Sequence, residues 1–149
     1  MRAKTPMTRK VIVVPPELTL RSAYHVMTRE RIRHLPVVRA GALIGMLSDR
    51  DVLARGSLGK DGVLHLGSDI VVGEAMAPTP LVTCDESTDV ADLVRMMTEK
   101  KIDAVPVVRG LRLVGLVTST DLLLLLIDQD EARPLPFDFD VVDDPAAYA

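Results

Sequence analysis

The chain is 149 residues long and 48% hydrophobic, which suffices for a globular fold with one core or two small ones. Only 3% of the residues are aromatic, there is no Trp, and Tyr24 is the one ring that precedes the last thirteen residues. The net charge is −3, and because seven acidic residues oppose a single Arg from Asp128 onward, residues 1–127 carry +3. This balance excludes a protein that stacks single-stranded nucleic acid on rings in a positive groove, and it disfavours DNA binding.

The number of cysteines and the hydropathy pattern indicate the cellular environment of the protein. Cys84 is the only cysteine, so no internal disulfide can form, and no Cys/His cluster has zinc-ligand spacing. We therefore expect a reducing, cytoplasmic environment and no metal site. The longest apolar run, residues 122–127, is far shorter than the roughly 20 residues that cross a bilayer, and the run at 11–14 ends too early for a signal peptide. No membrane partner is expected.

An internal repeat organises the sequence. When the chain is shifted by 70 positions, residues 35–39 fall on 105–109 and residues 45–53 fall on 115–123. Eight of the eighteen positions from Pro36 to Leu53 are identical to their counterparts. Such self-similarity indicates two copies of one structural unit.

Each half is predicted to fold as β-α-β-β-α. In chain order, a β-branched run predicts a strand, an amphipathic pattern after an N-cap predicts a helix, two further runs predict a hairpin, and a second helix closes the half. The predicted strands are 11–14, 35–39 and 43–47, then 81–83, 105–109 and 113–117. The first predicted helix follows Thr19 and buries Leu20, Ala23, Tyr24 and Met27, and its counterpart follows Asp89 and buries Val90, Leu93, Val94 and Met97. The helices that close the two halves are predicted at 49–55 and 119–127.

Composition divides the chain into segments. We expect the first repeat at 6–56, a glycine-containing surface linker at 57–73, the second repeat at 74–127 and an acidic tail at 128–149. Neither half buries much surface alone, so the two are expected to pack into one body.

The most informative motif is Gly-h-h-Ser/Thr-x-x-Asp, where h is apolar, at 45–51 and 115–121. In a purely structural interpretation, Ser48 and Thr118 are helix N-caps, and Asp51 and Asp121 are their capping-box partners. In a functional interpretation the same helix start is half of a nucleotide site, with amides and a hydroxyl for phosphate and a carboxylate for both hydroxyls of a ribose. The motif alone leaves both interpretations open.

The ordered repetition of several motifs resembles a tandem cystathionine-β-synthase (CBS) domain pair, also called a Bateman module, over residues 6–127. The likeness rests on Met7 and Met76, on residues 31–38 and 101–108, and on the two Gly-to-Asp segments. It implies an α/β (α+β) fold of two repeats packed through their sheets with pseudo-two-fold symmetry. It also implies a regulatory or sensor module, with no required cofactor, that binds AMP, ADP, ATP or S-adenosylmethionine in clefts between the repeats.

The resemblance also assigns binding residues, because each cleft in the family takes a carboxylate from one repeat and lining residues from the other. The Asp121 cleft is assigned Thr118, Thr120, Asp121, Ile12, Ile32, Arg33 and His34. The Asp51 cleft is assigned Ser48, Arg50, Asp51, Val82, Ile102 and Asp103. The family lines adenine with aliphatic side chains, which fits a chain nearly devoid of rings.

Charge distinguishes the two clefts. Arg33 and His34 would face phosphates in the Asp121 cleft, whereas their counterparts are Asp103 and Ala104, and Arg50 compensates only in part. We expect the Asp121 cleft to be the better mono- or diphosphate site. The Asp51 cleft is expected to be weak, empty or suited to a less anionic adenosyl ligand.

Other functions remain as alternatives. One is a ligand-free dimeric adaptor with vestigial clefts, in which the acidic tail with Phe137 and Phe139 is a docking element rather than a solvated segment. An enzyme is disfavoured, since no nucleophile, base or metal partner accompanies the carboxylates. Residues 122–127 hold more leucine than one helical face needs, and CBS pairs commonly form homodimers, so a homodimer is expected, with a regulated protein as a further partner.

Overall fold

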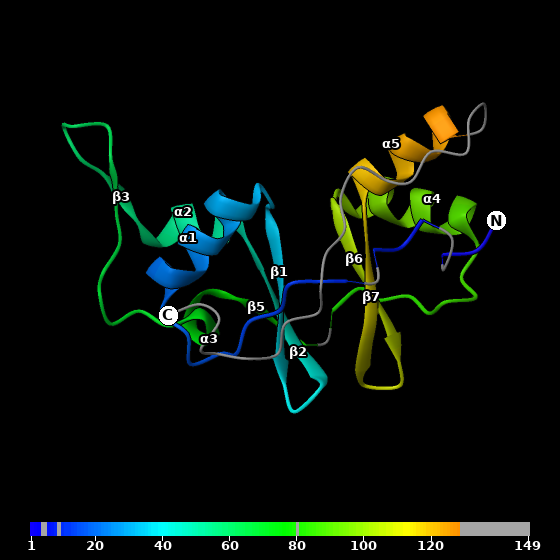
Figure 1. The fold of residues 1–149 in the computed structure, drawn as a ribbon, viewed down its shortest axis with the longest axis horizontal. Helices are drawn as coiled ribbons and strands as arrows, with labels where there is room; N and C mark the ends of the chain where they lie inside the picture. The colour runs from blue at the N-terminus through cyan, green and yellow to red at the C-terminus, as the bar shows by residue number, and fades with distance from the viewer. Residues whose placement is uncertain (4–5, 9, 80, 129–149) are drawn as a thin grey trace. The chain divides into compact units, whose positions relative to one another are not determined.

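The computed structural model describes residues 1–3, 6–8, 10–79 and 81–128 (Figure 1). Within them the chain divides into two compact units. The first-repeat unit is Ile12–Leu81, and the second-repeat unit combines Met1–Val11 with residues 82–128. The acidic tail beyond Asp128, with Phe137 and Phe139, lies outside the described residues.

The first-repeat unit contains a helix, a hairpin and a second helix in the predicted order. Its first helix begins after Thr19, whose hydroxyl accepts a hydrogen bond from the Ser22 amide. Of the predicted face, Leu20, Ala23 and Met27 are buried against β1 and β2 and Tyr24 is only half-buried, while Val26 is buried as well. Strands β1 and β2 are antiparallel, and β5 adds to the other edge of β2. The elements are α1 (Leu20–Glu30), β1 (His34–Arg39), β2 (Ala42–Ser48), α2 (Asp49–Arg55), β3 (Ser57–Leu58), β4 (Leu64–His65), α3 (Val72–Ala75) and β5 (Ala77–Pro78).

The second-repeat unit repeats this arrangement. Its first helix is capped by Asp89, which accepts from the Ala91 amide, and its buried Leu93 and Met97 pack on the hairpin through Val105 and Val117. The burial predicted for Val94 is wrong, because this side chain is 41% exposed, and Val90 is half-buried. The elements are α4 (Val90–Lys100), β6 (Ala104–Arg109), β7 (Arg112–Thr118) and α5 (Ser119–Asp128), with β6 and β7 antiparallel. The mixed helix-and-strand fold and its repeat are therefore confirmed.

The strands predicted at 11–14 and 81–83 are wrong as continuous strands. In the first run, Val14 makes an isolated parallel bridge with Val37, and Ile12 is also a bridge residue. No residue of the second run is in a strand, and the parallel bridge there joins the next residue, Cys84, with Val107. The Val14 amide donates to the Pro36 carbonyl, and the Cys84 amide donates to the Pro106 carbonyl. Because proline has no N–H to return to residue 12 or 82, the parallel ladder stops after one bridge.

The segment before each repeat packs on the other repeat's unit. Met7 is buried in the core of the second-repeat unit, and the Thr8 amide and carbonyl both bond to the backbone of Leu116. In the first-repeat unit β5 takes the equivalent place, where Ala77 pairs with Met46. The compact unit that contains the first repeat starts at Ile12.

The connection between the repeats is only partly on the surface. The β3–β4 hairpin extends away from the rest of the first-repeat unit (Figure 1), and Leu58 on it is 74% exposed. Leu66 and Val72, however, are buried in the first-repeat core. The hairpin is therefore on the surface, whereas the stretch that leads into α3 places apolar side chains in the first-repeat core.

Candidate functional site

The junction of β7 and α5 holds a buried carboxylate. Asp121 is 3% exposed, and no other charged side chain among the described residues is buried to this degree. Its Oδ2 accepts from the Thr118 amide at 2.9 Å, and its own amide donates to the Thr118 hydroxyl at 3.2 Å, which completes the predicted capping box. Burial raises the pKa of Asp121, and the hydrogen bonds from Thr118 and Thr8 oppose that rise.

Thr8 is a site residue that sequence reasoning missed. Its hydroxyl lies 3.3 Å from both carboxylate oxygens of Asp121 and donates to them. The backbone of Thr8 is fixed by hydrogen bonds with Leu116, one residue after Gly115, where close approach of the chain is possible. A signal was available: Met7-Thr8 and Met76-Ala77 stand at the same place before each repeat.

The junction of β2 and α2 is the counterpart in the first-repeat unit. Ser48 caps α2, and Asp51 Oδ2 accepts from the Ser48 amide at 2.8 Å and from the Ser48 hydroxyl at 3.0 Å. Asp51 is half-buried rather than buried. Ala77 stands where Thr8 does in the other unit, so this carboxylate takes its hydroxyl partner from its own cap.

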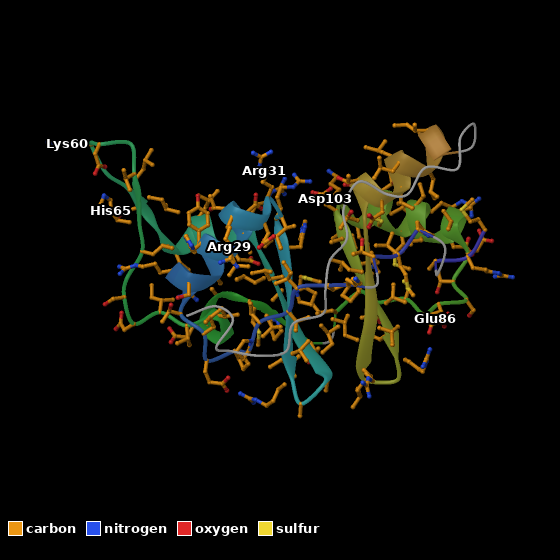
Figure 2. The ribbon with its side chains drawn as sticks, viewed as in Figure 1. Arg29, Arg31, Lys60, His65, Glu86 and Asp103 are labelled. Atoms are coloured by element: carbon orange, nitrogen blue, oxygen red, sulfur yellow. The ribbon has the colours of Figure 1, made fainter. Side chains whose placement is uncertain are left out.

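The loop after α1 brings cations to the start of α2. The Arg33 carbonyl accepts from the Asp49 amide at 2.9 Å, which places this loop beside the Ser48–Asp51 cap. Arg33 and Arg50 are exposed and form no ion pair within the described part of the chain, and His34 is half-buried at the start of β1. Arg31 extends into solvent from the same loop (Figure 2). Exposed arginines therefore give this edge of the first-repeat unit a positive charge.

The equivalent edge of the second-repeat unit has another charge. Here the Asp103 carbonyl accepts from the Ser119 amide at 2.9 Å, so Asp103, labelled in Figure 2, takes the place of Arg33. Thr120 is exposed at the position of Arg50. Ile102 packs against the core beside this edge and leaves part of its side chain exposed. This edge therefore has the buried carboxylate of Asp121, and at the two positions that hold Arg33 and Arg50 in the first-repeat unit it has no arginine.

A sequence model of the CBS domain matches residues 5–57 and again residues 72–128. The chain belongs to the CBS domain family. It is 32% identical over 130 residues to the CBS domain-containing protein YhcV of Bacillus subtilis (strain 168), an alignment that covers 87% of this chain and 88% of YhcV. The chain also matches two longer relatives, of whose length it spans only 35% and 21%.

Solved CBS structures are similar to this fold. The structure of CBSX2 in complex with AMP is 26% identical, with a TM-score of 0.72, and the match covers 87% of this chain and 98% of that one. The CBS domain pair of protein MJ0100, in complex with 5′-methylthioadenosine and S-adenosyl-L-methionine, is 25% identical, with a TM-score of 0.69, over 85% of this chain and 99% of that one.

The residues assigned to each CBS cleft are divided between the units. Thr118, Thr120 and Asp121 lie in the second-repeat unit, whereas Ile12, Ile32, Arg33 and His34 of the same set lie in the first-repeat unit. Conversely, Ser48, Arg50 and Asp51 lie in the first-repeat unit, and Val82, Ile102 and Asp103 lie in the second. Within a unit, the structure joins Thr118 with Asp121 and Ser48 with Asp51, and it places Arg33 beside the latter pair. Ile12, Ile32, Val82 and Ile102 are half-buried aliphatic side chains.

Other candidate side chains have structural surroundings. Cys84 is 7% exposed, and burial, with a smaller effect of the Asp85 charge, raises the pKa of its thiol to about 11, so the group stays protonated at neutral pH. Within the described residues no three His, Cys, Asp or Glu side chains form a metal-binding group, and no described helix is long and apolar enough to cross a membrane.

Proposed function

We propose that this CBS pair is a regulatory module that binds an adenosyl ligand, with Asp121 as the carboxylate that accepts the ribose hydroxyls. The observation that carries the proposal is the Asp121 junction, where a buried carboxylate is held at a helix start by an amide and by a hydroxyl from another segment. A carboxylate in such a place can accept from both hydroxyls of a ribose. The complexes of CBSX2 with AMP and of MJ0100 with adenosyl compounds support the ligand class.

The remaining parts of the proposed Asp121 site supply charge and lining. Thr118 and Thr120 would offer hydroxyls to the ligand, and Arg33 with His34 would meet its phosphate. Ile12 and Ile32 would line adenine with aliphatic surface. Because Arg33, which forms no ion pair with the described residues, is a strong, permanent cation with a planar fork of donors, this arrangement favours AMP, ADP or ATP over the sulfonium of S-adenosylmethionine.

The proposed Asp51 site is weaker. Ser48, Arg50 and Asp51 would bind with Val82 and Ile102, but Asp103 would stand where Arg33 stands in the other site. A carboxylate at that point repels phosphate, so we infer that this site stays empty or takes a less anionic adenosyl ligand. The partners of both carboxylates are hydroxyls and amides rather than a base or a nucleophile, which supports a regulatory role over a catalytic one.

A thermal-shift experiment on ligand-depleted full-length protein tests the proposal. AMP, ADP, ATP, S-adenosylmethionine and adenosine are each titrated, with GMP as the base control. A ligand that binds only the folded protein stabilises it by about 2.7 kcal/mol at a hundred times its Kd, so at least one adenine nucleotide is expected to raise Tm.

Paired carboxylate variants assign the site by calorimetry. Asp121→Ala is expected to abolish adenine nucleotide binding, Asp51→Ala to leave the tighter event in place, and Asp69→Ala, an exposed loop carboxylate, to change nothing. Equal losses in the first two variants contradict the ranking of the sites. If no adenosyl compound shifts Tm, the function proposed here fails, and the ligand-free adaptor is favoured.

We also infer that the chain forms a homodimer through α5. Leu123, Leu126 and Ile127 are 63%, 70% and 68% exposed, and their spacing places them on one side of the helix. Three large apolar side chains together on one helical face are typical of a surface that packs against another helix. A second copy would supply the same face, as a two-fold dimer requires.

A further inference from the structure

The two carboxylate junctions differ in one hydroxyl. Thr8 and Ala77 hold equivalent places, since Thr8 bridges Leu116 on β7 and Ala77 pairs with Met46 on β2, its counterpart 70 residues earlier. Each also brings its carbonyl against a glycine, at 3.1 Å from a Cβ built on Gly115 and 2.9 Å from one built on Gly45. Only the segment with Thr8 offers the nearby carboxylate a side-chain donor.

The position of Thr8 is tightly fixed. Its amide donates to the Leu116 carbonyl at 2.8 Å, and its carbonyl accepts from the Leu116 amide at 3.0 Å. The preceding Met7 is 4% exposed in the core of the second-repeat unit, so the segment is anchored on both sides of the peptide bond. The hydroxyl therefore reaches Asp121 from a backbone that cannot easily withdraw.

We propose that Thr8 is a positioning residue for Asp121, and that its hydroxyl makes the Asp121 junction the one that selects a ribose with both hydroxyls. This selection rests on the function proposed above. The hydroxyl lies equally far from Oδ1 and Oδ2, at 3.3 Å, so it bridges the carboxylate and fixes its rotation. The Thr118 amide donates to Oδ2, so two donors from two segments hold the plane of the carboxylate. The lone pairs that accept no bond within the protein then have a fixed orientation in which to accept from a ligand.

The Thr8 hydroxyl also affects the protonation state of Asp121. Accepting a hydrogen bond stabilises an ionised carboxylate, so Thr8 lowers the pKa of Asp121 against the larger, opposite effect of burial. An ionised carboxylate accepts from both hydroxyls of a ribose, whereas a protonated one presents a donor to them. Asp51 is less buried, and it bonds to the hydroxyl of its own helix cap instead.

The first test uses the ligand-free protein. Thr8→Val removes the hydroxyl and keeps the side-chain shape, and Thr8→Ser restores the donor. The carboxyl carbon of Asp121 is followed by NMR through a pH titration. Thr8→Val is expected to raise the apparent pKa of Asp121, and Thr8→Ser to bring it back. An unchanged titration in Thr8→Val overturns the positioning role, whether or not any nucleotide binds. If Thr8→Val does not fold, Thr8→Ala takes its place in the same comparison.

The second test measures selection, with AMP and 2′-deoxyAMP as probes. Thr8→Val is expected to weaken AMP binding about tenfold, because a carboxylate that is free to rotate loses about one of its two hydrogen bonds from the ribose, while affinity for 2′-deoxyAMP changes less. Ala77→Thr is the matched variant at the equivalent place and is expected to leave the Asp121 titration unchanged. An equal loss for both probes in Thr8→Val overturns the claim of selection. If the wild type binds neither probe while its titration depends on Thr8, the proposed function fails and the positioning role stands.

Discussion

The carbonyl oxygen of Ala77 on β5 lies against Gly45 on β2, 2.9 Å from the place that a Cβ on Gly45 would occupy. The side chain of Met76 crosses the same spot. Gly115 has the same relation to Thr8, although the carbonyl is slightly farther away at 3.1 Å. A glycine in a strand is therefore what lets the segment before each repeat cross the other repeat's hairpin.

We predict that Gly45→Ala destabilises the protein by about 1–3 kcal/mol, the usual cost of forcing extra atoms into a packed site. The cost is expected to exceed that of Gly115→Ala, because the methionine sulfur and the backbone carbonyl both lie closer to the Cβ position at Gly45 than to the one at Gly115. Urea unfolding gives both values, with Gly67→Ala, at an exposed loop position, as control. A Gly45→Ala variant as stable as the wild type would show that β5 can move away without loss.

The buried Asp121 makes stability depend on pH. Burial raises its pKa in the folded protein above the value of about 3.9 of an unfolded chain, so the folded state holds the proton more tightly. The stabilisation this gives is complete below the unfolded pKa and is lost as the pH rises through the folded pKa. In Asp121→Asn this dependence is absent, so the free energy of unfolding of the wild type, relative to the variant, is expected to fall between pH 4 and neutral pH.

Denaturant unfolding at a series of pH values measures this difference, and Asp69→Asn controls for the loss of one surface charge. A relative stability that rises with pH would contradict the sign, because the hydrogen bonds from Thr118 and Thr8 would then outweigh burial.

Part of the segment between the repeats belongs to the first-repeat core. Val72 is fully buried there, whereas Val63 in the same connection is 53% exposed. Val72→Ala removes two buried methyl groups and is expected to cost about 2 kcal/mol of unfolding free energy. Val63→Ala is expected to change it by less than about 0.5 kcal/mol. Equal effects in urea unfolding would mean that α3 is only a connector.

The repeat, the hairpins and the helix caps were predictable from the sequence because each depends on neighbours along the chain. Thr19, Ser48 and Asp89 cap helices as their positions indicated, and Ser48 pairs with Asp51 as its spacing required. These are short-range relations, and one amino-acid pattern determines each of them.

What the sequence could not provide are contacts between distant segments. The bond from Thr8 to Asp121 joins residues 113 positions apart, and no periodicity connects them. The isolated bridges at Val14 and Cys84 depend on which partner strand presents a proline, so β-branched composition alone overestimated the strands. The burial of Val72 likewise depends on a core formed by other parts of the chain.

Arg33 is predicted to recognise phosphate rather than adenosine. Its side chain is exposed, and it forms no ion pair within the described residues, so it is available to an anion. If the proposed Asp121 site is right, Arg33→Ala weakens AMP about tenfold and leaves adenosine unchanged, since a hydrogen bond to a charged group is worth about 1.5–3 kcal/mol. Arg29→Ala, on α1 and paired with Glu30, is the control in the same calorimetric titration. A similar loss for AMP and adenosine would remove Arg33 from the phosphate.

The exposed face of α5 is predicted to join two copies of the chain. Leu126→Glu places a charge where the apolar side chain would be buried, and in a two-fold dimer the change occurs twice in one interface. The dimer is expected to dissociate at least about a hundredfold more readily, and size-exclusion chromatography with light scattering follows this as a shift to the monomer mass. Leu58→Glu, at an equally exposed leucine on β3, is the control and is expected to leave the dimer intact. A monomeric wild type, or a Leu126→Glu variant that stays dimeric, would exclude α5 as the interface, because a buried glutamate at its centre could not be tolerated.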